Sequence, residues 1–73
     1  MKPVLLIDFG STYTKTTCVD VASARILGTA QSYTTVETDV GEGLENALRE
    51  LRAQTGISEF AERYACSSAA GGL

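Results

Sequence analysis

An apolar run at residues 4–7, Val-Leu-Leu-Ile, stops abruptly at the sequence Asp-Phe-Gly-Ser-Thr of residues 8–12. A continuous apolar run that contains β-branched residues is typical of a strand that is buried on both faces. Residues 13–21 are rich in Thr, Val and Tyr, which suit a second strand. Because a short Gly-Ser-Thr connection joins neighbouring antiparallel strands, the chain is predicted to begin with a β-hairpin.

The rest of the chain predicts a third strand, a helix and a fourth strand. Residues 25–33 follow a small polar turn and complete a three-stranded meander. Apolar residues recur at helical spacing between positions 40 and 51, Asp39 is a candidate capping residue, and Gly56 is placed to end the helix in a left-handed conformation. Residues 64–67 predict a fourth strand, which a right-handed crossover would place parallel to the first. The predicted fold class is therefore α/β.

The length of 73 residues limits the chain to one domain with a thin core. Two distant cysteines and the lack of histidine indicate no disulfide or zinc site to support it. Cys18 and Cys66 are expected to be small buried side chains in strands of a cytosolic protein. The sequence stops directly after a small-residue loop, where a further helix is expected. We therefore expect residues 1–73 to be the truncated N-terminal part of a longer domain.

The charge of the chain argues against two classes of partner. Its net charge is −3, and its six basic residues are scattered rather than clustered, so no surface for nucleic acid or an anionic membrane is predicted. The apolar run at residues 4–7 is also too short for a signal peptide or a membrane span. We expect a cytoplasmic protein.

The residues that could bind a phosphate lie at the end of the first strand and directly after it. Backbone N–H groups at Gly10 and Ser11 could form an anion-binding nest, to which the Ser11 and Thr12 hydroxyls add donors. Lys15 can bring positive charge to a phosphate from the second strand. Asp8, at the end of the first strand, suits Mg²⁺, which takes one or two protein carboxylates beside nucleotide phosphates.

An ordinary hairpin turn is the alternative explanation of this motif. Asp, Gly, Ser and Thr also form turns through local side-chain hydrogen bonds, and an isolated match favours that interpretation. The preceding apolar strand, the following threonine-rich strand and the position of Lys15 favour the phosphate site.

Residues 6–15 resemble the first phosphate motif of acetate and sugar kinases, heat-shock chaperone ATPases and actin. The chain as a whole resembles more closely the MutL/GlmL family, which is encoded alongside adenosylcobalamin-dependent glutamate mutase and related mutases. That family is distinct from the DNA mismatch-repair protein called MutL. The closer resemblance is carried by residues 5–15, 26–31, 34–37 and 43–48 and, most specifically, by the ending Cys-Ser-Ser-Ala-Ala-Gly-Gly-Leu at residues 66–73.

The resemblance implies a ribonuclease H-like fold, here an incomplete actin-like ATPase half-domain that binds ATP and Mg²⁺. Asp8 and Lys15 would be its catalytic residues, with Asp8 also the metal ligand. The protein would help to keep an adenosylcobalamin-dependent mutase active, so its partners would be mutase subunits. In such folds the fourth strand ends at the nucleotide cleft, where four residues would face ATP, although a simple strand-end turn is an equal alternative for the two serines. These four are Ser67, Ser68, Gly71 and Gly72.

Two other functions remain compatible with the sequence. One is a small-molecule kinase, for a sugar or a carboxylate, on the same fold; such an enzyme needs a catalytic base, and none is recognisable. The other is a non-catalytic fragment. Phosphoryl transfer needs charge stabilisation from several sides, and the second phosphate motif and the adenosine motif are not found in these 73 residues. We therefore expect this chain alone to be inactive as an ATPase.

Overall fold

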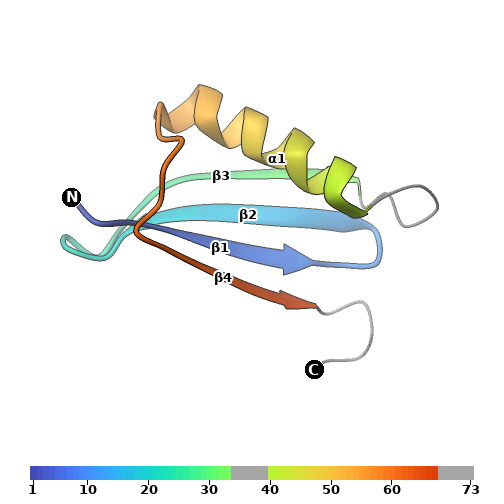
Figure 1. Ribbon diagram of the computed structural model, residues 1–73, viewed down its shortest axis with the longest axis horizontal. Coiled ribbons are helices and arrows are strands. Elements are labelled where there is room, and N and C mark those ends of the chain that lie inside the picture. The colour runs from blue at the N-terminus through green and yellow to red at the C-terminus, as the bar shows by residue number, and fades with distance from the viewer. Residues whose placement is uncertain (34–39, 68–73) are drawn as a thin grey trace.

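A computed structural model describes residues 1–33 and 40–67, which form one mixed sheet and one helix (Figure 1). The strands β1 (Pro3–Phe9), β2 (Tyr13–Asp20), β3 (Arg25–Tyr33) and β4 (Glu62–Ser67) lie in the order β3-β2-β1-β4. β2 pairs antiparallel with both β1 and β3, whereas β4 pairs parallel with β1. The α/β class, the three-stranded meander and the parallel fourth strand are confirmed.

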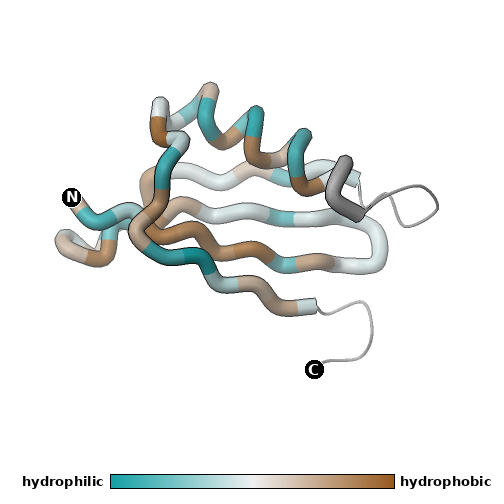
Figure 2. Tube along the Cα trace, viewed as in Figure 1, coloured by the Kyte–Doolittle hydropathy of each residue, from teal (hydrophilic) through white to brown (hydrophobic). Residues whose placement is uncertain are grey.

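Helix α1 (Val40–Thr55) packs on one face of the sheet, over β2 and β3 (Figure 1). Leu51 of the helix is buried with Leu5, Cys18 and Ala30, which come from β1, β2 and β3. Figure 2 shows the hydrophobic residues along β1 and along the side of α1 that faces the sheet. Full burial of a leucine side chain stabilises a fold by about 1.5–3 kcal/mol, so Leu5 and Leu51 are the main anchors of this small core.

The alternation of β2 decides what the helix covers. Thr14, Thr16 and Cys18 are completely buried on the helix side, and Lys15 between them is exposed on the other face. Buried hydroxyl groups are costly unless they are hydrogen-bonded, and the Thr16 hydroxyl donates to the Ala30 carbonyl oxygen at 3.1 Å. Both threonines are therefore buried at no such cost, because neither hydroxyl is among the buried polar atoms that lack a hydrogen-bond partner.

The end of α1 is set by a glycine, as the sequence predicts. Gly56 has a φ of 73°, and its N–H donates to the Arg52 carbonyl oxygen at 2.7 Å, the hydrogen bond of a left-handed helix cap. Just before it, the Thr55 hydroxyl donates to the Leu51 carbonyl oxygen at 2.9 Å and accepts the Ile57 N–H at 3.1 Å. The chain thus turns back toward the sheet within a few residues. The predicted capping residue Asp39 lies outside the described residues.

Gly28 allows α1 to lie close to β3. A one-residue bulge separates the pairs Cys18 with Gly28 and Val19 with Ile26, which leaves Leu27 as the extra residue of β3. A Cβ atom on Gly28 would lie 2.7 Å from Cγ2 of Thr55. The sheet and the end of the helix therefore approach more closely here than any side chain would permit.

The carboxylate of Asp20 ties the start of the chain to the turn between β2 and β3. Its Oδ1 accepts the Lys2 N–H at 2.9 Å and the Ala22 N–H at 3.1 Å, and its Oδ2 accepts the Ser23 hydroxyl at 2.7 Å. The Lys2 hydrogen bond first, and then those of Ser23 and Ala22, hold the pKa of Asp20 below its usual value. This mostly buried carboxylate therefore has a structural role, because it connects residue 2 to the turn after β2.

The two cysteines differ. Cys18 is buried in the core, as expected, and burial together with the nearby Asp20 raises the pKa of its thiol. Cys66 lies in a strand, but the expectation that it is buried is wrong, because it is exposed on the face away from α1. Its position opposite Asp8, whose side chain projects from that same face, sets this orientation.

Membrane crossing by a helix is not supported by residues 1–33 and 40–67, where no helix is both long and apolar enough to span a bilayer.

Substitution of Gly28 by alanine should destabilise the fold by about 1–3 kcal/mol, the usual cost of overpacking. Thr55 cannot rotate away without losing two hydrogen bonds, so the helix end must shift. Urea unfolding followed by circular dichroism measures the loss. Thr55→Ser keeps the hydroxyl and removes Cγ2, so the double variant should recover much of the stability; an additive double variant would show that this contact does not limit the approach.

Asp20→Asn should remove a pH-dependent part of the stability. Because the folded pKa of Asp20 lies below its unfolded value of about 3.9, the ionised group stabilises the fold above that pH, and the contribution is lost as the pH falls through the folded pKa. The difference in free energy of unfolding between wild type and variant should therefore be largest near pH 7 and shrink below about pH 4. Ser23→Ala should give a smaller effect, and identical pH profiles for wild type and Asp20→Asn would contradict the assignment.

Candidate functional site

The carboxyl ends of β1 and β4 meet at one edge of the sheet, next to the turn that leads into β2 (Figure 1). The parallel register sets Asp8 beside Cys66 and Phe9 beside Ser67. Strand ends of parallel pairs are common places for ligand sites, because the loops that follow them lie together. The predicted phosphate motif therefore lies at this edge.

Asp8 and Lys15 are direct neighbours across the hairpin. They occupy opposite positions in the antiparallel register of β1 and β2, so their side chains leave the same face of the sheet, away from α1. Residues opposite each other in this way have Cβ atoms about 4.5–5.5 Å apart. Asp8 is half-buried and Lys15 is exposed. An acid and an amine are thus placed together, as a Mg²⁺-phosphate site requires.

In the turn between β1 and β2, one backbone N–H forms a hydrogen bond within the turn. The Gly10 N–H donates to the Tyr13 carbonyl oxygen at 2.9 Å and closes the turn. That amide is engaged in this conformation, so donation to a phosphate depends on the amides and hydroxyls of Ser11 and Thr12. Both of these residues are exposed.

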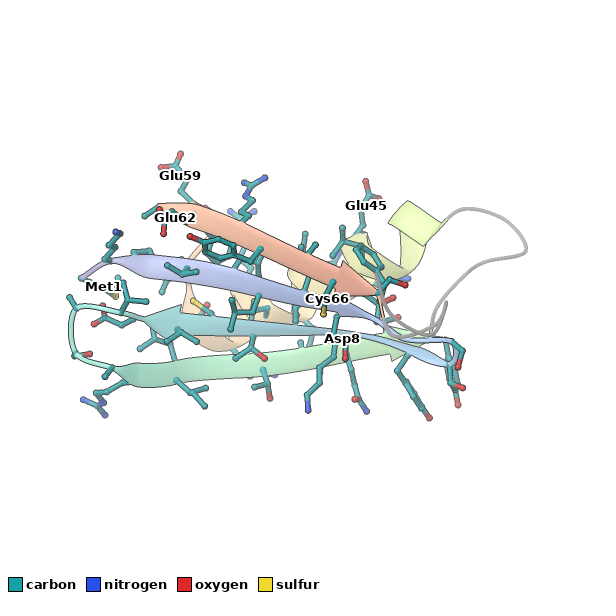
Figure 3. The ribbon with its side chains drawn as sticks, turned by 90° about the horizontal axis from the view of Figure 1, so that it is seen from below. Met1, Asp8, Glu45, Glu59, Glu62 and Cys66 are labelled. Carbon is teal, nitrogen blue, oxygen red and sulfur yellow. The ribbon has the colours of Figure 1, made fainter. Side chains whose placement is uncertain are left out.

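A shallow cavity of about 300 Å³ adjoins the Asp8 and Lys15 side chains on the open face. Figure 3, which views the molecule from below, shows Asp8 and Cys66 side by side. Ligand pockets span about 300–1,000 Å³, so this one has room for a phosphate group and a metal ion rather than for a whole nucleotide. It is lined by Leu6, Ile7, Asp8, Lys15, Thr17, Tyr64, Ala65 and Cys66.

Only Asp8 and Lys15 of this cavity were predicted as site residues from the sequence, and three of the others carry a hydroxyl or thiol group: Thr17, Tyr64 and Cys66. The Cys66 thiol lies 3.8 Å from Oδ1 of Asp8, within reach of a weak S–H···O hydrogen bond. The alternation of β2 could have placed Thr17 on the same face as Lys15. Tyr64 and Cys66 depend on the register between β1 and β4, which no local pattern determines.

The residues predicted at the end of β4 are only partly described. Ser67 lies at the same edge as Asp8, but its hydroxyl faces the Phe9 carbonyl oxygen at 3.4 Å, and its side chain leaves the opposite face of the sheet. Ser68, Gly71 and Gly72 lie outside the described residues. Within residues 1–33 and 40–67, no group of three or more His, Cys, Asp or Glu side chains is arranged to hold a metal ion. Among the described residues, Asp8 could hold Mg²⁺ without a second protein carboxylate, because this ion commonly keeps several waters and binds phosphate oxygens.

The fold and this edge define a small α/β protein with an acid and an amine at the carboxyl ends of two parallel strands. The chain belongs to the MutL protein family, whose sequence profile matches residues 4–73. It is 49% identical, over an alignment of 75 residues, to Protein MutL of Clostridium tetanomorphum. The alignment covers 100% of this chain and 16% of that relative, so the chain spans about one sixth of the length of the relative.

Proposed function

We propose that this chain forms the phosphate-binding edge of an ATP-dependent activator with an actin-like, ribonuclease H-like fold. The observation that carries the proposal is the placement of Asp8 and Lys15 at opposite positions of the hairpin, beside the turn of residues 10–12. The predicted roles of acid, amine and turn require that all three lie on one side of the sheet. An Asp8 side chain buried under α1 would have contradicted these predicted roles.

The chemistry follows from the groups at this edge. The Asp8 carboxylate would hold Mg²⁺ through one oxygen or through a water, and the Lys15 ammonium would balance charge on a terminal phosphate. The hydroxyls of Ser11 and Thr12 would donate to phosphate oxygens. A cavity of about 300 Å³ suits these groups alone, so the adenosine would be bound by other parts of the polypeptide.

The proposed protein partner is an adenosylcobalamin-dependent mutase such as glutamate mutase, and the proposed location is the cytoplasm. Membership of the MutL family supports this assignment, together with the resemblance of the chain to proteins encoded beside that mutase. In such a protein the nucleotide state would drive a hinge between two lobes and change the grip on the mutase. The small-molecule kinase remains the competing proposal on the same fold.

Binding of Mg²⁺-ATP should raise the melting temperature of this chain. A ligand that binds only the folded state stabilises it by about 1.4 kcal/mol at ten times its dissociation constant, or roughly 5–10 °C for a domain of this size. Thermal unfolding with Mg²⁺-ATP, with ATP and EDTA, and with Mg²⁺ alone measures the shift. Only the first condition should give the full effect.

Matched variants test which groups cause this shift. Asp8→Asn should remove its dependence on Mg²⁺, and Lys15→Ala should abolish most of it. Lys2→Ala removes the other lysine of the chain, which lies far from this edge, and should leave the shift unchanged. An equal effect of the two lysine variants, or no shift with millimolar Mg²⁺-ATP, would defeat the proposed site.

Turnover of ATP should require the longer protein and the mutase. This chain alone should show negligible ATP hydrolysis, because one edge cannot stabilise the transferring phosphate from several sides. A MutL protein of full length should consume ATP faster when adenosylcobalamin-dependent mutase is added, as measured by phosphate release. Stimulation by a sugar or a carboxylate instead would favour the kinase.

A further inference from the structure

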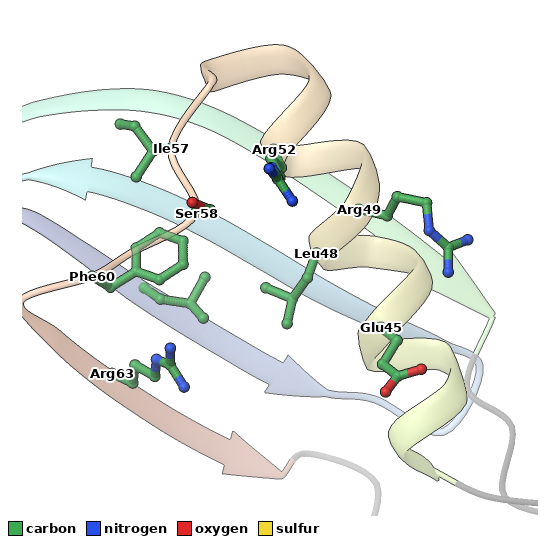
Figure 4. A pocket seen from close by; sticks show the side chains of 9 residues that line it. Glu45, Leu48, Arg49, Arg52, Ile57, Ser58, Phe60 and Arg63 are labelled. Carbon is green, nitrogen blue, oxygen red and sulfur yellow. The ribbon is translucent and has the colours of Figure 1, made fainter.

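A second hollow lies on the opposite side of the sheet, between α1, the connection after it and the start of β4. Figure 4 shows this groove, with Arg49 and Arg52 coming from the helix and Arg63 from β4. It has a volume of about 390 Å³, which is within the usual range for ligand pockets. Its lining residues are Leu5, Glu45, Leu48, Arg49, Arg52, Ile57, Ser58, Phe60 and Arg63.

The charge of the groove is opposite to that of the chain. The protein carries a net charge of −3 and has four arginines, of which three line this groove beside a single acid, Glu45. The fourth, Arg25, begins β3 and is not part of the groove. Positive charge is thus gathered here on a chain that is acidic overall, which favours an anionic occupant.

Two of the three guanidinium groups contact an uncharged neighbouring side chain. Arg49 donates from Nη1 to Oδ1 of Asn46 at 3.2 Å, and the Arg63 guanidinium lies 5.9 Å from the centre of the Phe60 ring. Neither Arg52 nor Arg63 forms an ion pair with another of the described residues. Since arginine binds carboxylates with a planar fork of donors, the rim is suited to carboxylate side chains.

The floor of the groove is apolar. Leu5 is fully buried, and Leu48, Ile57 and Phe60 are half-buried against the same core. These three side chains leave part of their apolar surface uncovered between the arginines (Figure 4). A simple inorganic anion would use the rim and leave this floor exposed to water. An occupant with one apolar stripe and acidic flanks would use both.

We propose that this groove binds an acidic amphipathic helix, contributed by the part of the MutL polypeptide that this chain does not span. The chain covers 16% of the length of its relative, so most of that polypeptide is available to supply the helix. A helix is the favoured shape because parallel strand pairs such as β1 and β4 are normally covered by helices, and α1 contacts mainly β2 and β3. This inference is independent of the proposed nucleotide site, which lies on the other face.

Overlapping peptides test the proposal directly. Labelled peptides that tile the part of Clostridium tetanomorphum MutL outside the matched segment are titrated with this chain, and binding is followed by fluorescence anisotropy. The tightest binders should be acidic and amphipathic, and their affinity should fall as salt is raised. Arg52→Gln with Arg63→Gln should weaken them about tenfold, because two exposed ion pairs are lost. Arg25→Gln is the matched control and should bind like the wild type.

Several outcomes would overturn the proposal. These are tightest binding by neutral or basic peptides, an equal loss with Arg25→Gln, full displacement by millimolar inorganic phosphate, and no binding by any peptide. Thermal unfolding of each variant shows whether it is folded, and the exposure of all three substituted side chains leads us to expect unchanged melting. A variant that melts early is replaced by the corresponding Arg→Lys variant, which keeps the charge but loses the fork and should weaken binding by a smaller factor.

Discussion

The hydrogen bonding of β1 to strands on both of its sides is the constraint on which the rest of this structure depends. β1 pairs antiparallel with β2 and parallel with β4, so the backbone groups of the most apolar strand are satisfied from both directions. The same two registers set Asp8 opposite Lys15 on one side and opposite Cys66 on the other. A shift of either neighbour by one residue would move its side chains to the other face and separate these groups. The charged edge is therefore a direct product of strand pairing.

The two faces of the sheet differ in what they carry. On one face, α1 covers Leu5, the buried threonines of β2 and Cys18, and the cost of burying a hydroxyl group is offset by the hydrogen bond from Thr16 to Ala30. On the other face, Leu6 and Tyr64 are substantially exposed beside Asp8 and Lys15, and the rings of Tyr13 and Tyr33 stack with centroids 4.9 Å apart. Large apolar side chains on an open face commonly mark a surface that other parts of a protein cover. This agrees with a chain that spans only 16% of its MutL relative.

The proposed phosphate edge and the arginine-lined groove lie on opposite faces and share β1 and β4 as their common support. Leu5 contributes to the groove, and its strand neighbours Leu6 and Asp8 contribute to the cavity on the open face. In β4, Arg63 and Tyr64 divide between the two faces in the same way. Strand alternation would thus let two short segments serve both proposed ligands, a phosphate with its metal on one face and an acidic helix on the other.

Local patterns in the sequence were enough to predict the four strands, the helix, its glycine cap and the hairpin that carries Asp8 and Lys15, because each depends on residues only a few positions apart. The nearness of Asp8 to Lys15 belongs to this group, since seven residues and one tight turn bring them together. Three features were not predicted from the sequence. They are the exposure of Cys66, the position of Arg63 beside the arginines of α1, and the hydrogen bond between Asp20 and Lys2. Cys66 and Asp8 are 58 residues apart, and Arg63 also reaches its neighbours only after the chain has crossed over and returned. Their relative positions depend on the register of a parallel strand pair and on the packing of α1. Both are set by which side chains the complete fold buries, and no single segment of the sequence contains that information.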